Sequence, residues 1–281
     1  MNALLTVEDL RVSFPGKGWG ARRVEVLRGV SLDIAPGETL GLVGESGSGK
    51  TTIGRAILGL VPVQSGAITF GGERLDRVKA RRRRELGRDL QVIFQDPYTS
   101  LNPSRTIGDT LSEPLLGQGI GSREARLRVG RLLDRVHLPA DAAWRLPREF
   151  SGGQRQRVAI ARALAIDPKL IVCDEPVSAL DLTTQKTVLD LLVEIQEQTG
   201  VAYLFVSHDL AVVRFVSHRV AVIHRGEIVE SGQAATVTTQ PRHPYTRGLL
   251  LAAPVADVAE QRARRQAFEL EYGGPNRTAE R

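Results

Sequence analysis

A glycine-rich segment that ends in a lysine is the first group of residues whose types and spacing could do chemistry. Gly44-Glu45-Ser46-Gly47-Ser48-Gly49-Lys50-Thr51 matches the pattern G-x-x-x-x-G-K-[ST], and Thr52 follows it. Glycines let successive backbone N–H groups turn toward one anion, and a following helix N-terminus adds positive potential. We expect these residues to bind a nucleoside triphosphate, with Lys50 on the β- and γ-phosphates and the Thr51 hydroxyl on Mg²⁺. The alternative is a glycine-rich turn without function, but a buried strand before the segment and a helix after it favour the binding site.

Two acids directly follow an apolar run, Leu170-Ile171-Val172-Cys173, later in the chain. A carboxylate at the tip of a buried strand beside a phosphate loop can hold Mg²⁺ through water, which is the role expected of Asp174. The adjacent Glu175 can polarise an attacking water as a general base. Strands also end in Asp because Asp favours turns, so the pattern gains its weight from the phosphate loop.

Ser151-Gly152-Gly153-Gln154 opens a predicted helix over 155–165. These residues could form a second anion-binding helix N-terminus. The alternative is an ordinary helix cap that happens to contain two glycines. Because the chain has one phosphate loop, the sequence leaves open whose phosphate a second N-terminus would bind.

The elements that must position these residues alternate between strands and helices. Near-continuous apolar runs at 39–43, 170–173 and 202–206 are typical of strands buried on both faces, and helices are predicted over 51–60 and 182–198. Two further strands, 219–223 and 227–230, are predicted to pair around Arg225-Gly226. Alternation of this kind indicates an α/β fold, here a P-loop NTPase core with a mostly parallel central sheet.

Two additions to this core are predicted. Residues 4–7, 10–14, 24–27 and 30–34 alternate apolar with polar side chains, which indicates an N-terminal antiparallel β subdomain. The segment from about 96 to 167 is helical, rich in arginine and broken by prolines, which indicates an inserted α-helical subdomain. We therefore expect one domain over 1–250 and a partly mobile C-terminal extension over 251–281.

Composition excludes several classes of protein. The 281 residues are 42% hydrophobic and 25% charged, which is ordinary for a globular chain. No uncharged apolar run approaches the ~18–20 residues that span a bilayer, and the first residues show no secretory signal, so a cytoplasmic location is expected. The single cysteine, Cys173, excludes an internal disulfide and a metal site built from several cysteines. A net charge of +6 permits an anionic partner, but with 5% aromatic residues and no basic-aromatic stripe we expect no nucleic acid.

The order of the motifs resembles the ATP-binding subunit of an ABC transporter. The residues that carry the resemblance are Gly44–Thr51, Gln95, Ser151–Gln154, Asp174–Glu175, Ser178–Asp181 and His208. The resemblance implies ATP and Mg²⁺ as ligands and two such domains that face each other head to tail. Ser151 and Gly153 of one domain would then contact the γ-phosphate held by the other.

The resemblance also implies roles for three single residues. Gln95 would sense Mg²⁺ and the attacking water, His208 would contact the γ-phosphate and that water, and Asp181 would cross the dimer interface. An aromatic residue usually stacks on the adenine, and counting back from Val26-Leu27 places it near Ala21. Phe14 and Trp19 are the nearby aromatic residues.

Two longer segments, 92–103 and 243–250, resemble the peptide and nickel importer branch of that family. This implies transmembrane permease subunits, a second identical or sister ATP-binding subunit and, indirectly, an extracytoplasmic solute-binding protein. The chain would then lie peripherally on the cytoplasmic face of the cell membrane, with residues 95–116 as the docking surface. The run Arg81–Arg84 would be a solvated face or a contact with lipid or a partner.

Three other functions compete with import. An ABC-type ATPase that serves an enzyme complex, such as one for carbon–phosphorus bond cleavage, has a very similar sequence. An ABC protein that acts on nucleic acid or the ribosome commonly carries two such domains or a long coiled coil, neither of which is visible. An unrelated P-loop kinase or GTPase gains no support, because there is no Asn-Lys-x-Asp motif.

Overall fold

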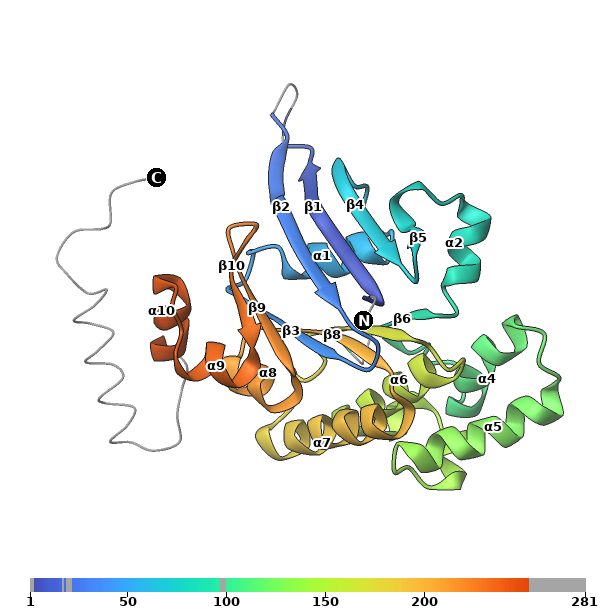
Figure 1. Ribbon diagram of the computed structural model, residues 1–281. Coiled ribbons are helices and arrows are strands. Elements are labelled where there is room, and N and C mark those ends of the chain that lie inside the picture. Colours follow the sequence, from blue (N-terminus) through green and yellow to red (C-terminus); the bar gives the residue numbers. More distant parts are fainter. Residues whose placement is uncertain (1–2, 17, 19–21, 97–99, 253–281) are drawn as a thin grey trace.

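The computed structural model describes residues 3–16, 18, 22–96 and 100–252, which form two sheets and the helices around them (Figure 1). The smaller sheet is antiparallel, and its strands in spatial order are β2 (Val24–Ile34), β1 (Leu5–Phe14), β4 (Ser65–Phe70) and β5 (Glu73–Arg74). The larger sheet has the order β10 (Glu227–Gln233), β9 (Arg219–His224), β3 (Thr39–Val43), β8 (Ala202–Ser207), β7 (Leu170–Asp174) and β6 (Leu90–Ile93).

The larger sheet is parallel apart from one edge strand. Strands β9, β3, β8, β7 and β6 run in the same direction, and β10 pairs antiparallel with β9 through the turn at Arg225-Gly226. Every residue of β3 and of β8 is buried. The predicted fold class, a mostly parallel core with an N-terminal antiparallel sheet and a helical insertion, is confirmed.

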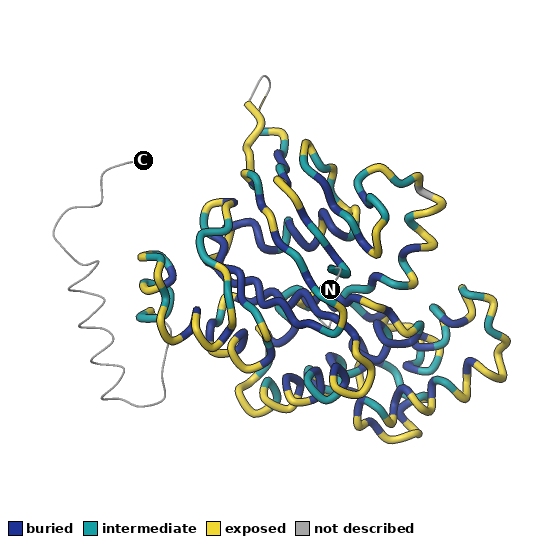
Figure 2. Tube along the Cα trace, in the orientation of Figure 1, coloured by how far each residue is buried: buried dark blue, intermediate teal, exposed yellow. Residues whose placement is uncertain are grey.

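Alternate side chains of the central strands face two separate cores. Leu42, Val172 and Leu204 point to the layer formed by α1 (Lys50–Ile57) and the antiparallel sheet. Val43, Cys173 and Phe205 point to the opposite layer, which contains α6 (Gly152–Leu164), α7 (Leu182–Thr199) and α8 (Leu210–Val216). The central strands accordingly form the darkest part of the burial view (Figure 2).

Strand β1 differs from its prediction as two strands. It is continuous, but its pairing with β2 shifts in register between Val7 and Leu10, and Asp9 has a φ of 43°. Such a bulge adds a residue and breaks the alternation of apolar and polar side chains. The sequence therefore resembles two short strands although the backbone forms one.

The inserted helices extend beside β6 at the edge of the larger sheet (Figure 1). They are α4 (Ile107–Gly117), α5 (Ser122–Arg135), the short 3₁₀ turns η2 (Ala140–Trp144) and η3 (Pro147–Glu149), and then α6. Pro114 is one of the prolines that predict a break in this helical segment, but it lies inside α4. The fully buried Leu111 and Leu115 pack α4 onto the core. The burial of each side chain stabilises the fold by about 1.5–3 kcal/mol, which offsets the ~3 kcal/mol that a proline inside a helix costs.

Several short elements were not predicted from the sequence. Besides β4, β5 and β6 they are the 3₁₀ turn η1 (Leu75–Arg77) and the helices α2 (Ala80–Leu86), α8, α9 (Ala234–Thr239) and α10 (Pro244–Ala252). Of the predicted C-terminal extension over 251–281, residues 251 and 252 end α10 and the rest lies outside the described residues. Among the helices that the structure describes, none is long and apolar enough to cross a bilayer.

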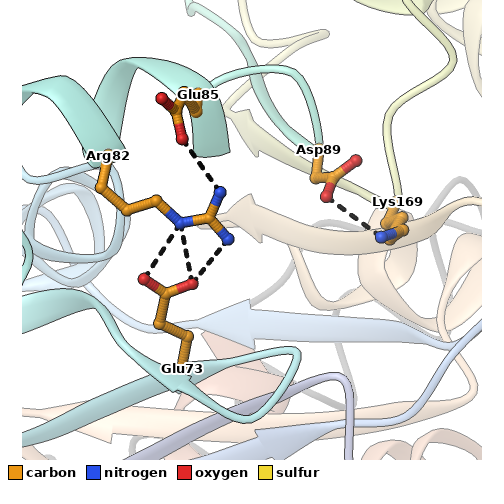
Figure 3. Close-up of polar contacts among 5 residues, drawn as sticks. All are labelled: Glu73, Arg82, Glu85, Asp89 and Lys169. Carbon is orange, nitrogen blue, oxygen red and sulfur yellow. Dashed lines mark hydrogen bonds and ion pairs between the residues drawn. The ribbon is translucent and has the colours of Figure 1, made fainter.

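The arginine run of α2 is partly used inside the chain. Arg82 pairs with Glu73 at 2.8 Å and with Glu85 at 3.1 Å, which ties α2 to β5, and nearby Lys169 pairs with Asp89 at 3.0 Å (Figure 3). Arg83 donates to the backbone oxygen of Leu75, whereas the Arg81 side chain is 93% exposed. Arg82 and Arg83 thus stabilise the packing of α2, while Arg81 contributes to a charged surface.

The buried thiol of Cys173 provides a test of the core. It is fully buried on β7, and burial together with the neighbouring Asp174 carboxylate raises its pKa. We expect a thiol reagent to label the native protein at least about a thousandfold more slowly than the protein in denaturant, because labelling requires global opening. Mass spectrometry of the labelled chain measures this, and rapid native labelling would contradict the placement of β7 in the core.

Candidate functional site

The predicted site residues follow the carboxyl ends of neighbouring parallel strands. Gly44 follows β3, His208 lies just after β8, Asp174 ends β7 and Gln95 lies just after β6. Parallel strands end at the same edge of their sheet, so segments far apart in sequence meet there. This edge is the candidate functional site.

The glycine-rich loop passes from β3 into α1. Gly49 is the N-cap of α1 with a φ of 111°, and a Cβ there would lie 2.7 Å from the Leu27 side chain, so the position favours glycine. No side chain caps this helix, and the buried Ser48 hydroxyl has no hydrogen-bond partner within the described residues. Free donors at a helix N-terminus fit an anion such as a phosphate.

Lys50 is buried beside this loop. Its Nζ donates to the backbone oxygens of Gly44 at 2.7 Å and of Glu45 at 2.8 Å. Burial lowers the pKa of Lys50, and the carboxylates of Glu175 and Asp174 oppose that shift. The ammonium group therefore lies against the loop. A rotation of the Lys50 side chain would bring it onto an anion bound there.

Thr51 and Asp174 place two oxygen donors together. The Thr51 hydroxyl donates to Asp174 Oδ1 at 3.0 Å. Burial raises the pKa of Asp174, the Thr51 hydrogen bond opposes this, and the nearby Glu175 charge adds to it. Mg²⁺ prefers hard oxygen ligands, usually one or two from protein with the rest from water and phosphate. A hydroxyl and a carboxylate in contact fit that ion.

Glu175 is the centre of a second contact set. Its Oε2 accepts a hydrogen bond from Gln95 Nε2 at 3.3 Å and lies 3.3 Å from His208 Nδ1. Its φ is 47°, a left-handed conformation that is uncommon for a residue other than glycine, and its backbone N–H donates to the oxygen of Val206 at 3.0 Å. The structure thus brings together the three residues predicted as catalytic, and holds Glu175 in a costly conformation of the kind that clusters at functional sites.

Ser151–Gln154 form the capped start of α6. Ser151 Oγ accepts from the Gln154 backbone at 3.3 Å, and Gln154 Oε1 accepts from the Ser151 backbone at 2.9 Å, which is a capping box. Asp181 is the N-cap of α7, and its Oδ1 accepts hydrogen bonds from the backbone N–H groups of Thr183 and Thr184. Thr184 also donates its hydroxyl to Asp181 Oδ2 at 2.6 Å.

These two helix starts do not meet the phosphate loop within one chain. In the part of the chain that the structure describes, no hydrogen bond or ion pair joins Ser151–Gln154 or Asp181 to Gly44–Thr52. Helix α1 lies on one face of the larger sheet and α6 and α7 lie on the other (Figure 1). The predicted site residues therefore form two separate groups.

Tyr245 is among the residues that contact the phosphate loop without having been predicted to do so from the sequence. Tyr245 on α10 accepts a hydrogen bond from the Glu45 backbone N–H at 3.0 Å, across 200 residues of sequence. Its segment was noticed only as a family feature, and nothing local indicates the contact. Of the positions considered for adenine, Trp19 and Ala21 lie outside the described residues, and Phe14 is half-buried at the end of β1.

A glycine-rich loop between a buried parallel strand and a helix, with acids ending a nearby strand, defines the class of P-loop nucleoside triphosphatases. Within that class the chain belongs to the ABC transporter family, whose sequence profile matches residues 27–178. A second profile, described as the C-terminal region of oligopeptide/dipeptide transporters, matches residues 229–272. The resemblance predicted from the motifs, including its peptide branch, is confirmed.

Curated relatives are similar over most of this chain. A glutathione import ATP-binding protein, GsiA, from Shigella flexneri serotype 5b is 54% identical over 267 residues, or 93% of this chain and 43% of that protein. GsiA from Salmonella typhimurium is 53% identical over 245 residues, or 87% of this chain and 39% of that protein. The chain thus spans less than half the length of these relatives.

Solved structures share the fold. A dimeric post-hydrolysis state of the ATP-binding cassette MJ0796, bound to ADP and Pi, aligns with a TM-score of 0.73 at 29% identity over 82% of this chain and 98% of that one. The protein cbiO1 from Clostridium perfringens, part of the ABC transporter complex cbiONQ, aligns with a TM-score of 0.77 at 27% identity over 85% of this chain and 92% of that one.

The close approach of α6 and α7 gives a test of the second group. A Cβ at Gly153 would lie 2.1 Å from Thr184 Cγ2, so Gly153→Ala should lower the free energy of unfolding by about 1–3 kcal/mol. Adding Thr184→Ser removes that methyl group and should restore most of the loss. Chemical denaturation measures both.

Gly130 on α5 is the matched control for the Gly153→Ala and Thr184→Ser variants. A Cβ there meets nothing within 4 Å, so Gly130→Ala should stabilise the protein by about 0.5–1 kcal/mol. Equal effects of Ala at positions 130 and 153 would show that α6 and α7 do not approach as described.

Proposed function

We propose that this chain binds and hydrolyses ATP and thereby drives an importer for peptides or a related small solute. The observation that carries the proposal is the convergence of Lys50, Thr51-Asp174 and the Glu175 contacts at one sheet edge. The names of the relatives and the ADP and Pi of the MJ0796 structure support ATP as the nucleotide and import as the process.

The phosphate loop and its neighbours would hold MgATP. The backbone of Gly44–Thr52 would surround the phosphates, and Lys50 would exchange its two backbone acceptors for β- and γ-phosphate oxygens. Thr51 and Asp174 would hold Mg²⁺, the latter through water, with Gln95 as a further metal ligand. The ion would offset the negative charge of the phosphates.

Glu175 would act on the attacking water. Its carboxylate would accept the proton as the water oxygen bonds to the γ-phosphorus and the bond to the β–γ bridging oxygen breaks, which yields ADP and phosphate. Gln95 and His208 hold Oε2 of this carboxylate from two sides. They would keep it oriented, and His208 would also contact the γ-phosphate.

A second copy or a sister subunit would complete each site. The Ser151–Gln154 group lies on the opposite face from α1, and no hydrogen bond or ion pair among the described residues joins it to the phosphate loop of its own chain. Two chains packed head to tail around a two-fold axis would present Ser151, Gly152, Gly153 and Gln154 of each to the nucleotide of the other, with Asp181 at the interface. ATP would then join the two chains, and hydrolysis would let them part.

The remaining partners follow from import. Residues 1–250 would be the ATP-binding domain, and the inserted helices at about 96–167 would pass its motion to transmembrane permease subunits that dock on 95–116. A solute-binding protein outside the cell would act through the permease, and the chain would lie on the cytoplasmic face of the membrane. Import is favoured over service to an enzyme complex, because the relatives are named as import proteins.

Glu175→Gln tests the hydrolytic step. We expect the variant to bind ATP, to form a stable dimer in its presence and to lose nearly all turnover, because an amide cannot accept the proton. Gel filtration with ATP and phosphate release measure these two effects. A monomer with undiminished hydrolysis would overturn the assignment.

Lys50→Ala is the complementary test and should lose nucleotide affinity instead. Removal of one charge-assisted phosphate contact, worth about 1.5–3 kcal/mol, should weaken MgATP binding roughly tenfold to a hundredfold. Isothermal titration measures the affinity, and Lys186→Ala, at an exposed residue of α7 that pairs with Asp190 and lies over the Phe215 ring, is the control. Equal affinities for the two alanine variants would contradict the phosphate role of Lys50.

A further inference from the structure

The segment before α10 is fixed to β10 by one carboxylate. Glu230 accepts hydrogen bonds from the backbone N–H groups of Arg242 at 2.8 Å and His243 at 3.1 Å. Burial acts to raise the pKa of Glu230, but the Arg242 N–H, the Thr246 side chain and the His243 N–H together outweigh it and lower the pKa. An ionised Glu230 therefore sets where α10 begins.

From that start, α10 brings Tyr245 against the end of β9. The Tyr245 ring lies 3.9 Å from the His224 ring, centroid to centroid, and the Tyr245 backbone donates to His243 Nδ1 at 3.2 Å. Leu249, one turn further on, packs against the core. The backbone hydrogen bond to His243, the contact with the His224 ring and the packing of α10 thus fix Tyr245, so its hydroxyl has a defined position.

The Tyr245 hydroxyl and Lys50 bind the same peptide group, the one between Gly44 and Glu45. The Glu45 N–H donates to Tyr245 Oη at 3.0 Å, and the Gly44 oxygen of the same peptide accepts from Lys50 Nζ at 2.7 Å. A peptide group is planar, so its N–H and C=O can only turn together. The orientation that satisfies Tyr245 is therefore the one that presents the Gly44 oxygen to Lys50.

We propose that Tyr245 is a positioning residue for the phosphate loop, and that its hydroxyl couples the C-terminal region of the chain to nucleotide affinity. The proposal rests on the nucleotide site of the proposed function. Burial raises the pKa of Tyr245 although the Glu45 N–H opposes the shift, so the hydroxyl stays neutral and accepts this bond at ordinary pH. Without it, the peptide could turn freely and the loop would be ordered only when the nucleotide binds.

Tyr245→Phe isolates the hydroxyl, because the ring, the His224 contact and the helix remain. Loss of one hydrogen bond that orders the loop should weaken MgATP binding and raise KM about three- to tenfold, with kcat within about twofold. Hydrogen exchange of the peptide that contains Glu45 should also become faster. A residue that merely anchored α10 would lower the melting temperature and leave the affinity and this exchange unchanged.

Tyr203→Phe is the matched control. The Tyr203 hydroxyl is buried on β8 and has no hydrogen-bond partner among the described residues, so its removal should leave affinity and exchange at the wild-type level. Glu230→Gln is a second variant that loosens the start of α10 without touching the phosphate loop, and it should raise KM in the same direction as Tyr245→Phe.

The outcomes separate this proposal from the one on which it rests. A wild-type protein that fails to bind MgATP overturns the proposed function. Wild-type and Tyr203→Phe proteins that bind equally well, together with a Tyr245→Phe protein that binds as they do, overturn only the role of Tyr245. Unchanged affinity in Glu230→Gln, with faster exchange in α10, overturns the coupling to the C-terminal region.

Discussion

The parallel register of the larger sheet is the constraint on which the rest of this structure depends. Because β3, β8, β7 and β6 run side by side in one direction, the residues that follow them meet at one edge. Lys50, Asp174, Glu175, Gln95 and His208 come from four segments of the chain, and no local feature would bring them together. An antiparallel neighbour at any of these places would send one group to the far edge of the sheet. Burial of both faces of the strands stabilises the register, since a shift by one residue would exchange the two cores.

At this edge of the sheet, neighbouring polar and charged groups offset part of the cost of burying Lys50 and Asp174. Lys50 loses solvation on burial, but two backbone oxygens and the carboxylates of Asp174 and Glu175 surround it. The Thr51 hydroxyl partly offsets the cost of burying Asp174. These are contacts that a bound anion and its metal ion could replace one by one. Lys50 within the loop and Tyr245 from outside it thus hold the loop in shape through contacts that leave its other donors available.

The two groups of site residues adjoin helices on opposite faces of the larger sheet, and this arrangement supports the proposal that two chains complete each site. The starts of α6 and α7 approach each other at Gly153 and Thr184, and Asp181 caps the second of these helices. The C-terminal helix adds a third element, since Tyr245 reaches the phosphate loop from the segment shared with oligopeptide and dipeptide transporters.

The sequence by itself determined the family, the fold class and the candidate residues, because the glycine-rich loop, the acids after an apolar strand and the glycine-led helix start are local patterns with local physical causes. It also indicated most of the long strands and helices. It did not indicate the bulge in β1, the continuation of α4 through Pro114 or the short elements, since each depends on packing between distant segments. Only the tertiary structure decided that Gln95 and His208 both contact Glu175, that the two groups lie on opposite faces, and that Tyr245 holds the Glu45 peptide. These contacts are set by strand order and by the docking of α10, and such geometry between segments up to 200 residues apart leaves no mark in the local pattern of residues.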